Sequence, residues 1–149
     1  MAKGNLLIID DEELLLKNIK YLLQGYADKT FLASNGLEGL KVLEKEDIHC
    51  VICDISMPQM NGVELIRVIR EKGSEVPFIF YTAYGHSELM IEAAKYGAFD
   101  FLKKPDFEGL EEVVSRGIKE GFKRKNFADM KEEMMTEYEK ILITIKNDL

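Results

Sequence analysis

Short apolar runs alternate with amphipathic stretches along most of the chain. Five near-continuous apolar runs have the length of strands and are typical of strands buried on both faces: 6–9, 29–33, 50–53, 76–81 and 98–102. Between and after them, apolar residues recur at helical spacing: 12–23, 36–43, 63–69, 86–96 and a last helix from residue 107. Alternating strands and helices at this short spacing predict βαβ units. The fold class is therefore α/β, a three-layer αβα sandwich around a parallel sheet.

The end of the chain has a different pattern. Residues 126–149 are rich in Glu, Lys and Met and contain neither Gly nor Pro, so helix can continue through them. No second globular domain fits in this length. We therefore expect a domain over 1–124 and a C-terminal helical extension over 125–149.

Apolar residues of this extension recur every seven positions, as in a coiled coil. The d positions hold Phe127, Met134 and Ile141, and the a positions hold Tyr138 and Ile145. Lys131 at an a position and Asp148 at a d position interrupt the seam. Two alternatives stay open: a homodimer through this helix, or a helix packed back on its own domain. A disordered tail fits the apolar spacing less well.

Charge narrows the classes of partner. The net charge is -7, and the one basic run, residues 119–125, includes a Glu and is short. Direct nucleic-acid binding needs clustered Lys and Arg, so neither a DNA-binding output nor a nucleic-acid partner is expected. The chain shows neither a signal-peptide pattern nor a segment long enough to span a membrane, so no membrane association is expected either.

The two cysteines, Cys50 and Cys53, have the spacing of a metal or redox motif. They lie in an apolar run that predicts a strand, where side chains three apart point to opposite faces. We therefore expect two buried structural thiols, which fits a reducing cytoplasm.

Polar side chains with complementary chemistry follow the ends of four predicted strands. They are Asp10, Asp11, Asp54, Thr82 and Lys104. Ligands of open α/β sheets bind beyond the carboxyl ends of the strands, so these side chains should converge. Three crowded carboxylates predict a site for Mg2+ (or Mn2+), a hard cation that prefers oxygen ligands. The alternative for the run Asp10-Asp11-Glu12-Glu13 taken alone is capping of the following helix and compensation of its dipole.

The same cluster suits phosphoryl transfer. A carboxylate such as Asp54 can act as a nucleophile and form an acyl phosphate. The reaction then needs mainly positioning and neutralisation of charge. Lys104 can pair with a phosphoryl oxygen and the Thr82 hydroxyl can donate to another. Taken singly, each could also be an ordinary strand-end residue.

Five short motifs in order resemble the receiver domain of bacterial response regulators, over residues 4–122. They are Ile8-Ile9-Asp10-Asp11-Glu12; Cys53-Asp54-Ile55-Ser56-Met57-Pro58 with Asn61-Gly62; Tyr81-Thr82-Ala83; Gly97-Ala98; and Phe101-Leu102-Lys103-Lys104-Pro105. The resemblance implies a flavodoxin-like (βα)5 fold with strand order 2-1-3-4-5.

The resemblance also implies roles for single residues. Asp54 corresponds to the phosphoacceptor, and Asp10 and Asp11 to the acid pair at the metal site. The backbone carbonyl of Ser56 corresponds to a third protein ligand of the metal, beside the carboxylates. Thr82 corresponds to the hydroxyl residue that follows the phosphoryl group.

Three further positions acquire roles in the same way. Lys104 corresponds to the lysine that precedes a proline, and Phe101 to the switch aromatic, which can also be a core residue. Ser56 and Tyr84 occupy the positions that tune attack of water on the acyl phosphate. A bulky Tyr84 is expected to shield the site and to lengthen the life of the phosphorylated state.

The resemblance predicts a phosphorelay regulator of the cytoplasm, a signalling switch rather than an enzyme acting on other substrates. A sensor histidine kinase or a histidine phosphotransfer protein would supply the phosphoryl group, and a downstream protein would respond. Two alternatives belong to other classes. One is a Mg2+-dependent phosphohydrolase with an aspartyl nucleophile, which Ser56 disfavours because those enzymes have a second acid there. The other is a dimeric scaffold that works without phosphorylation.

Overall fold

Five apolar runs form the parallel sheet that the hydrophobic pattern predicts. The computed structural model describes residues 3–83 and 87–149. The strands are β1 (Asn5–Ile9), β2 (Lys29–Ala33), β3 (Cys50–Cys53), β4 (Phe78–Thr82) and β5 (Asp100–Lys103). The helices are α1 (Glu13–Leu22), α2 (Gly36–Lys45), α3 (Gly62–Glu71), α4 (Ser87–Lys95) and α5 (Phe107–Asp148). The strand order is β2-β1-β3-β4-β5, which confirms the order that the resemblance implied.

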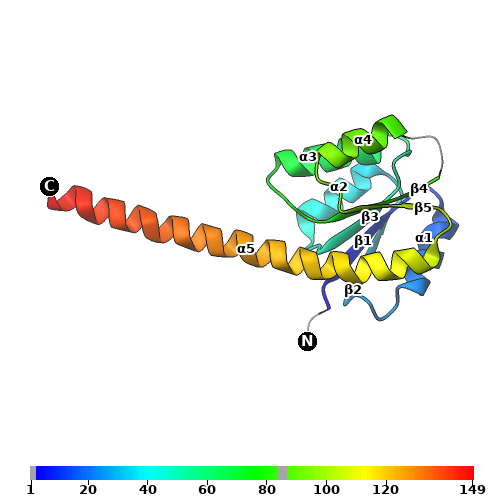
Figure 1. The fold of residues 1–149 in the computed structure, drawn as a ribbon, viewed down its shortest axis with the longest axis horizontal. Helices are drawn as coiled ribbons and strands as arrows, with labels where there is room; N and C mark the ends of the chain where they lie inside the picture. Colours follow the sequence, from blue (N-terminus) through cyan, green and yellow to red (C-terminus); the bar gives the residue numbers. More distant parts are fainter. Residues whose placement is uncertain (1–2, 84–86) are drawn as a thin grey trace.

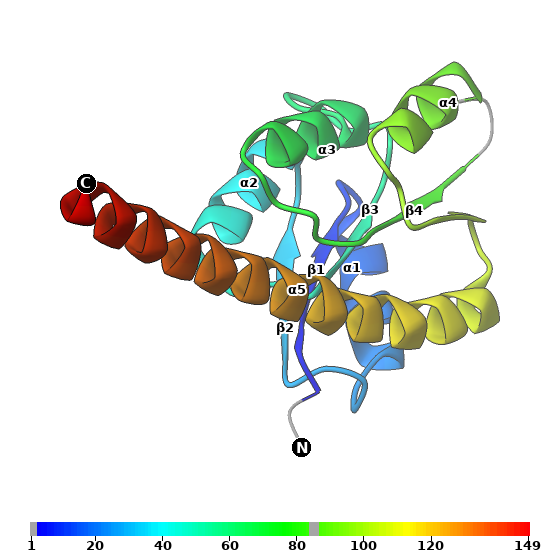
Figure 2. The ribbon, with the colours of Figure 1, turned by 60° about the vertical axis from the view of Figure 1, so that its left-hand side comes forward.

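Helices cover both faces of the sheet, so the three-layer sandwich is confirmed (Figures 1 and 2). Helices α1 and α5 bury one face, where Leu16 and Val114 contact the sheet residues of one core cluster. Helices α2, α3 and α4 bury the other face, through residues such as Leu65 and Ala93. The apolar side chains of the strands alternate between these two clusters, as the pleat of a strand requires.

The two cysteines confirm this alternation. Cys50 lies in the cluster under α1 and α5, and Cys53 lies in the cluster on the opposite face. Both are free and fully buried, and burial raises the pKa of the Cys50 thiol to about 12. Their spacing is therefore a consequence of strand packing and does not form a metal or disulfide site.

Two strands begin two residues later than predicted, and the other strand boundaries agree with the prediction to within one residue. β4 begins at Phe78 rather than two residues earlier, because the chain first crosses Pro77, which has no N–H to donate. β5 begins at Asp100 rather than at Ala98, whose N–H instead donates to Ala93 O (3.4 Å) at the end of α4. Helix geometry thus takes precedence over the apolar pattern at the start of β5.

The C-terminal helix is longer than a receiver domain requires. α5 runs without a break from Phe107 to Asp148, across the boundary predicted at 124/125. All residues of 126–149 are exposed, so the alternative in which this segment packs back on its own domain is wrong for this structure (Figure 1). No helix in the described parts of the chain, α5 included, is both long enough and apolar enough to cross a membrane.

Arg70 joins three segments that the sequence pattern does not connect. Its Nε donates to Tyr96 O (2.8 Å), and its Nη1 donates to Ser74 O (3.0 Å) and Val76 O (2.8 Å). The guanidinium also lies 5.6 Å from the centre of the Phe78 ring. The rigid fork of an arginine therefore fixes the end of α3 relative to the end of α4 and the start of β4.

We predict that Arg70→Lys lowers the free energy of unfolding by about 1–3 kcal/mol, because lysine cannot reach these carbonyls together. Urea unfolding of the full chain measures the change. Arg67→Lys is the matched control, since Arg67 is exposed on the same helix. Equal stability of both variants would contradict this role for Arg70.

Candidate functional site

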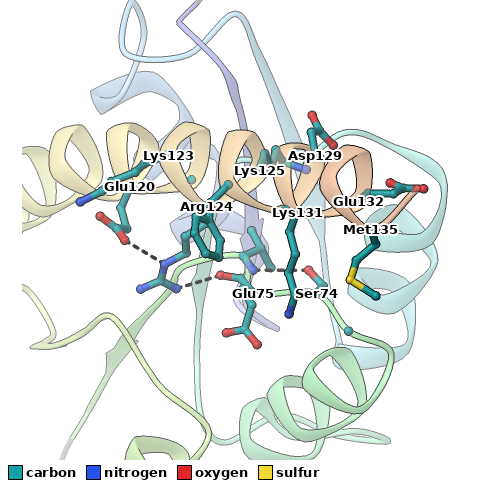
Figure 3. A pocket seen from close by; sticks show the side chains of 15 residues that line it. Ser74, Glu75, Glu120, Lys123, Arg124, Lys125, Asp129, Lys131, Glu132 and Met135 are labelled. Atoms are coloured by element: carbon teal, nitrogen blue, oxygen red, sulfur yellow. Dashed lines mark hydrogen bonds and ion pairs between the residues drawn. The ribbon is translucent and has the colours of Figure 1, made fainter. Parts of the chain in front are cut away.

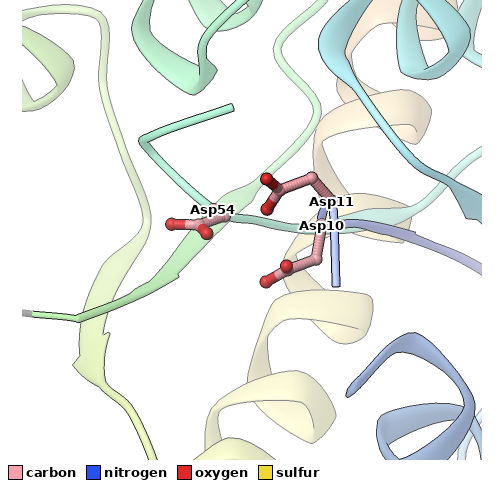
Figure 4. A group of neighbouring side chains, drawn as sticks. All are labelled: Asp10, Asp11 and Asp54. Carbon is pink, nitrogen blue, oxygen red and sulfur yellow. The ribbon is translucent and has the colours of Figure 1, made fainter. Parts of the chain in front are cut away.

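Three carboxylates meet where two central strands end. Asp10 follows β1 and Asp54 follows β3, and these neighbouring strands pair in register at Ile9 and Cys53. One carboxylate oxygen from each of Asp10, Asp11 and Asp54 lies within 4.8 Å of the others (Figure 4). Asp10 and Asp54 are buried, whereas Asp11 is exposed, so the cluster is open to solvent on one side.

The ammonium of Lys104 bridges the two buried carboxylates. Its Nζ lies 2.7 Å from Asp10 Oδ2 and 3.0 Å from Asp54 Oδ2. Burial disfavours the charged amine, but the hydrogen bonds to Asp10 and Asp54 outweigh it, so the pKa of Lys104 is raised. The neighbouring Lys103 ends β5 and is exposed.

Burial also raises the pKa of Asp10, against the hydrogen bonds that it accepts. One comes from Lys104 and another from the backbone N–H of Glu12, 2.9 Å from Asp10 Oδ1. This second bond, together with Glu13 in the first turn of α1, agrees with the alternative in which these acids cap the helix and offset its dipole. Glu12 occupies the cap position itself and its side chain makes no capping bond. The helix start and the acid cluster therefore share Asp10.

Thr82 is closer to Asp54 than the sequence suggested. Its Oγ1, buried at the end of β4, donates to Asp54 Oδ1 over 2.9 Å. Both oxygens of Asp54 thus have a donor, Thr82 on one and Lys104 on the other. The Thr82 hydroxyl therefore already lies within hydrogen-bonding distance of the Asp54 carboxylate.

Phe101 connects this edge to the core. Its ring stacks on Phe80 with centroids 5.6 Å apart and planes tilted by 19°. Phe80 precedes Thr82 by two residues on β4 and pairs in register with Phe101. Phe101 is half-buried and packs against the core on the α3–α4 side.

The backbone of Gly62, at the start of α3, lies close to the backbone of Asp54 and so fixes the ends of the loop between them. A Cβ on Gly62 would lie 2.5 Å from the Asp54 carbonyl oxygen, so only glycine fits there without a shift. Asn61 caps α3 by accepting a hydrogen bond from the N–H of Glu64 (2.9 Å).

Two predicted site residues follow the ends of β3 and β4, and no contact in the described part of the chain places them at the acid cluster. Ser56 is exposed in the loop after Asp54, and its backbone carbonyl stays a predicted metal ligand. Tyr84 lies outside the described residues.

The donor set suits a hard divalent cation. It consists of three carboxylates. Those of Asp10 and Asp54 are buried, and that of Asp11 is exposed to solvent. Such a set matches the ligands of Mg2+, which usually keeps several waters beside one or two carboxylates. Lys104, the residue that directly follows β5, supplies positive charge at the same place.

Comparison with known proteins agrees with this geometry. The sequence pattern of the response regulator receiver domain matches residues 6–115. The chain is 33% identical over 115 residues to the transcriptional regulatory protein ZraR of Klebsiella oxytoca, with 76% of this chain and 26% of that protein aligned. It is 32% identical over 143 residues to the regulatory protein AtoC of Escherichia coli (strain K12), covering 93% of this chain and 30% of that protein. The chain therefore spans only about a quarter to a third of these relatives.

Solved structures show the same fold. The response regulator receiver domain protein of Clostridium thermocellum superposes with a TM-score of 0.72 at 33% identity, over 84% of this chain and 98% of that one. Phosphorylation on an aspartate is typical of this family, whose members are signalling switches rather than conventional enzymes. The family match, the sheet order and the acid edge agree, and the chain belongs to the response regulator receiver domains of two-component signalling.

Proposed function

We propose that Asp54 is the phosphoacceptor of a Mg2+-dependent receiver that switches protein–protein contacts. The observation that carries the proposal is the environment of its carboxylate. Thr82 donates to one oxygen, Lys104 pairs with the other, and Asp10 and Asp11 stand beside it. This arrangement holds a nucleophile in place and supplies positive charge where phosphoryl oxygens would gather.

The phosphoryl donor would be the phosphohistidine of a sensor histidine kinase or of a phosphotransfer protein. An oxygen of Asp54 forms a bond to phosphorus as the bond from phosphorus to the imidazole nitrogen breaks, and that nitrogen regains a proton. Mg2+ held by Asp10, Asp11, Asp54 and the Ser56 carbonyl would neutralise part of the phosphoryl charge. Lys104 would move its ammonium from the carboxylates onto a phosphoryl oxygen.

The signal would leave the site through Thr82 and Phe101. When Thr82 donates to a phosphoryl oxygen, β4 shifts toward the site and Phe101 follows Phe80 inward. The surface formed by α4, β5 and α5 then changes its shape for a downstream protein. Phosphorylation needs only to favour one of two states that already exist. We place the switch in the cytoplasm, where the kinase domains and the reduced thiols of this chain would be found.

The acceptor is tested with a small-molecule phosphodonor such as acetyl phosphate in Mg2+. We expect the intact mass of the wild type to rise by one phosphoryl group, and Asp54→Asn to show no increase. Asp129→Asn, an exposed acid on α5, is the control and should be labelled like the wild type. A labelled Asp54→Asn chain would refute the assignment, and steady turnover of a phosphate ester would favour the phosphohydrolase instead.

The metal site is tested by thermal unfolding with and without Mg2+. A cation that binds only the folded chain raises the unfolding midpoint by mass action. We expect a rise for the wild type and a much smaller one for Asp11→Asn, because Asp11 is an exposed ligand whose change should leave the fold intact. Glu139→Gln removes the same charge from α5 and should keep the full rise. Equal rises in all three chains would exclude a site at Asp11.

Lys104→Met is expected to have two effects. Without the ammonium, Asp10 and Asp54 face each other unpaired, and the free energy of unfolding should fall by about 1–3 kcal/mol at neutral pH. Phosphorylation by acetyl phosphate should also slow by at least about tenfold, because one source of neutralising charge is lost. Lys103→Met is the control. If it slows labelling as much as Lys104→Met does, the bridging role of Lys104 is wrong.

A further inference from the structure

The free part of α5 carries an apolar stripe that nothing in the described chain covers. Beyond Lys125 the helix extends away from the domain (Figures 1 and 2). With about 100° between successive residues, most of its large apolar side chains fall on one face. The members of this stripe are Phe127, Met130, Met134, Met135, Tyr138, Ile141, Leu142, Ile145 and Leu149, each exposed by 47% or more. Ile143 lies on the opposite face.

A chain whose last helix exposes such a stripe is not expected to stay monomeric. Isolated helices are marginal in water, and most helical stability in proteins comes from packing of an apolar face. Contiguous exposed apolar surface of this kind usually marks an interaction site. The heptad spacing of the stripe further points to another helix as its partner.

The polar interruptions of the seam decide how two copies could align. In a parallel pair each a residue faces the same a residue and each d residue the same d residue. Lys131 would then face Lys131 of the second copy and Asp148 would face Asp148. Both layers would bury like charges, which destabilises a coiled coil.

The flanking e positions point the same way. They hold Ala128, Met135, Leu142 and Leu149, and all four are apolar. In a parallel pair e residues face g residues, which here include Glu137 and Thr144. In an antiparallel pair e faces e, so that apolar residues meet apolar residues.

We propose that the α5 stripe binds a second copy of this chain in an antiparallel two-helix coiled coil, with Lys131 facing Asp148 of the second copy. The same register places Met134 against Ile145 and Tyr138 against Ile141. Every interruption of the seam is thus paired with an opposite charge, and every other layer is apolar. The overlap from residue 131 to 148 is about 26 Å long.

A groove at the base of the stripe extends the same surface. It has a volume of about 1080 Å3 and lies between α5 and the segment from Gly73 to Val76 (Figure 3). Phe127 and Met135 belong to both the stripe and the groove lining. In the proposed register Leu149 of the second copy lies opposite Met130, near this groove.

The antiparallel arrangement separates the two receivers. Each domain lies at its own end of the coiled coil, and the Asp54 edges face no partner domain. The dimer would therefore form without phosphorylation and leave each α4–β5–α5 surface accessible near the site. The proposed dimer does not depend on phosphorylation of Asp54, so the Asp54→Asn variant should dimerise like the wild type.

Sedimentation of the full chain tests the stripe. Ile141 and Ile143 are 55% and 60% exposed in the single chain, so an aspartate at either should be equally harmless to a monomer. We expect Ile141→Asp to weaken dimerisation by at least about 100-fold, since it buries a charge in a central layer. Ile143→Asp should leave it unchanged. A monomeric wild type at all concentrations, or equal behaviour of the two variants, would overturn the proposal.

Disulfide formation tests the orientation. A chain with Met134→Cys should cross-link to a chain with Ile145→Cys when the two are mixed and oxidised. Neither should cross-link to itself, because equal positions lie about 16 Å apart along the axis, too far for a disulfide. The native Cys50 and Cys53 are fully buried and stay unreactive. Self-linked chains and no mixed product would show a parallel pair instead.

Charge reversal tests the register. Lys131→Asp should weaken the dimer roughly tenfold, since it places an acid against Asp148 in two symmetric layers. Adding Asp148→Lys to the same chain should restore the affinity, because the pairs are then reversed but complementary. Circular dichroism of each variant checks that α5 remains helical. A double variant that is as weak as Lys131→Asp would contradict the pairing.

Discussion

The ion pairs of Lys104 with Asp10 and Asp54 hold the functional edge together. Two carboxylates buried side by side repel each other, and water cannot screen them well. Lys104 comes from the end of β5, whereas the acids follow β1 and β3 in the middle of the sheet. The ammonium can reach both only because the five strands end at one edge in the order observed. The balance of charge at the site thus depends on the topology of the whole sheet.

Helix α5 links this edge to the opposite end of the domain. It starts next to the site, where Asp106 caps its first turn. It then crosses the face of the sheet, and near its middle Phe122 lies against His49, just before β3. Arg124 donates to the carbonyl of Glu75 (2.8 Å) as the helix leaves the domain. A continuous helix therefore joins the surface expected to respond to phosphorylation with the stripe expected to bind a second copy.

Sequence reasoning recovered the five strands and the five helices, and it expected the acids, Thr82 and Lys104 at one edge of the sheet, because strand ends can be read from local patterns. Apolar runs predict buried strands, and polar residues at their ends predict a shared edge. It failed where a contact with a neighbouring helix or loop decided the outcome. Ala98 looked like part of a strand until its N–H was taken by the end of α4. The apolar pattern assigned no role to Arg70, yet it donates to the carbonyls of Ser74, Val76 and Tyr96.

The sequence by itself determined which residues could form an acid cluster, and that the last helix has a heptad seam with Lys131 and Asp148 out of pattern. Composition and spacing are properties of the chain alone. Only the tertiary structure decided that Lys104 is the residue that bridges the acids, that Thr82 already donates to Asp54, and that the seam is left uncovered by its own domain. Distances between residues far apart in the chain follow from how helices and strands pack, and no local pattern contains them.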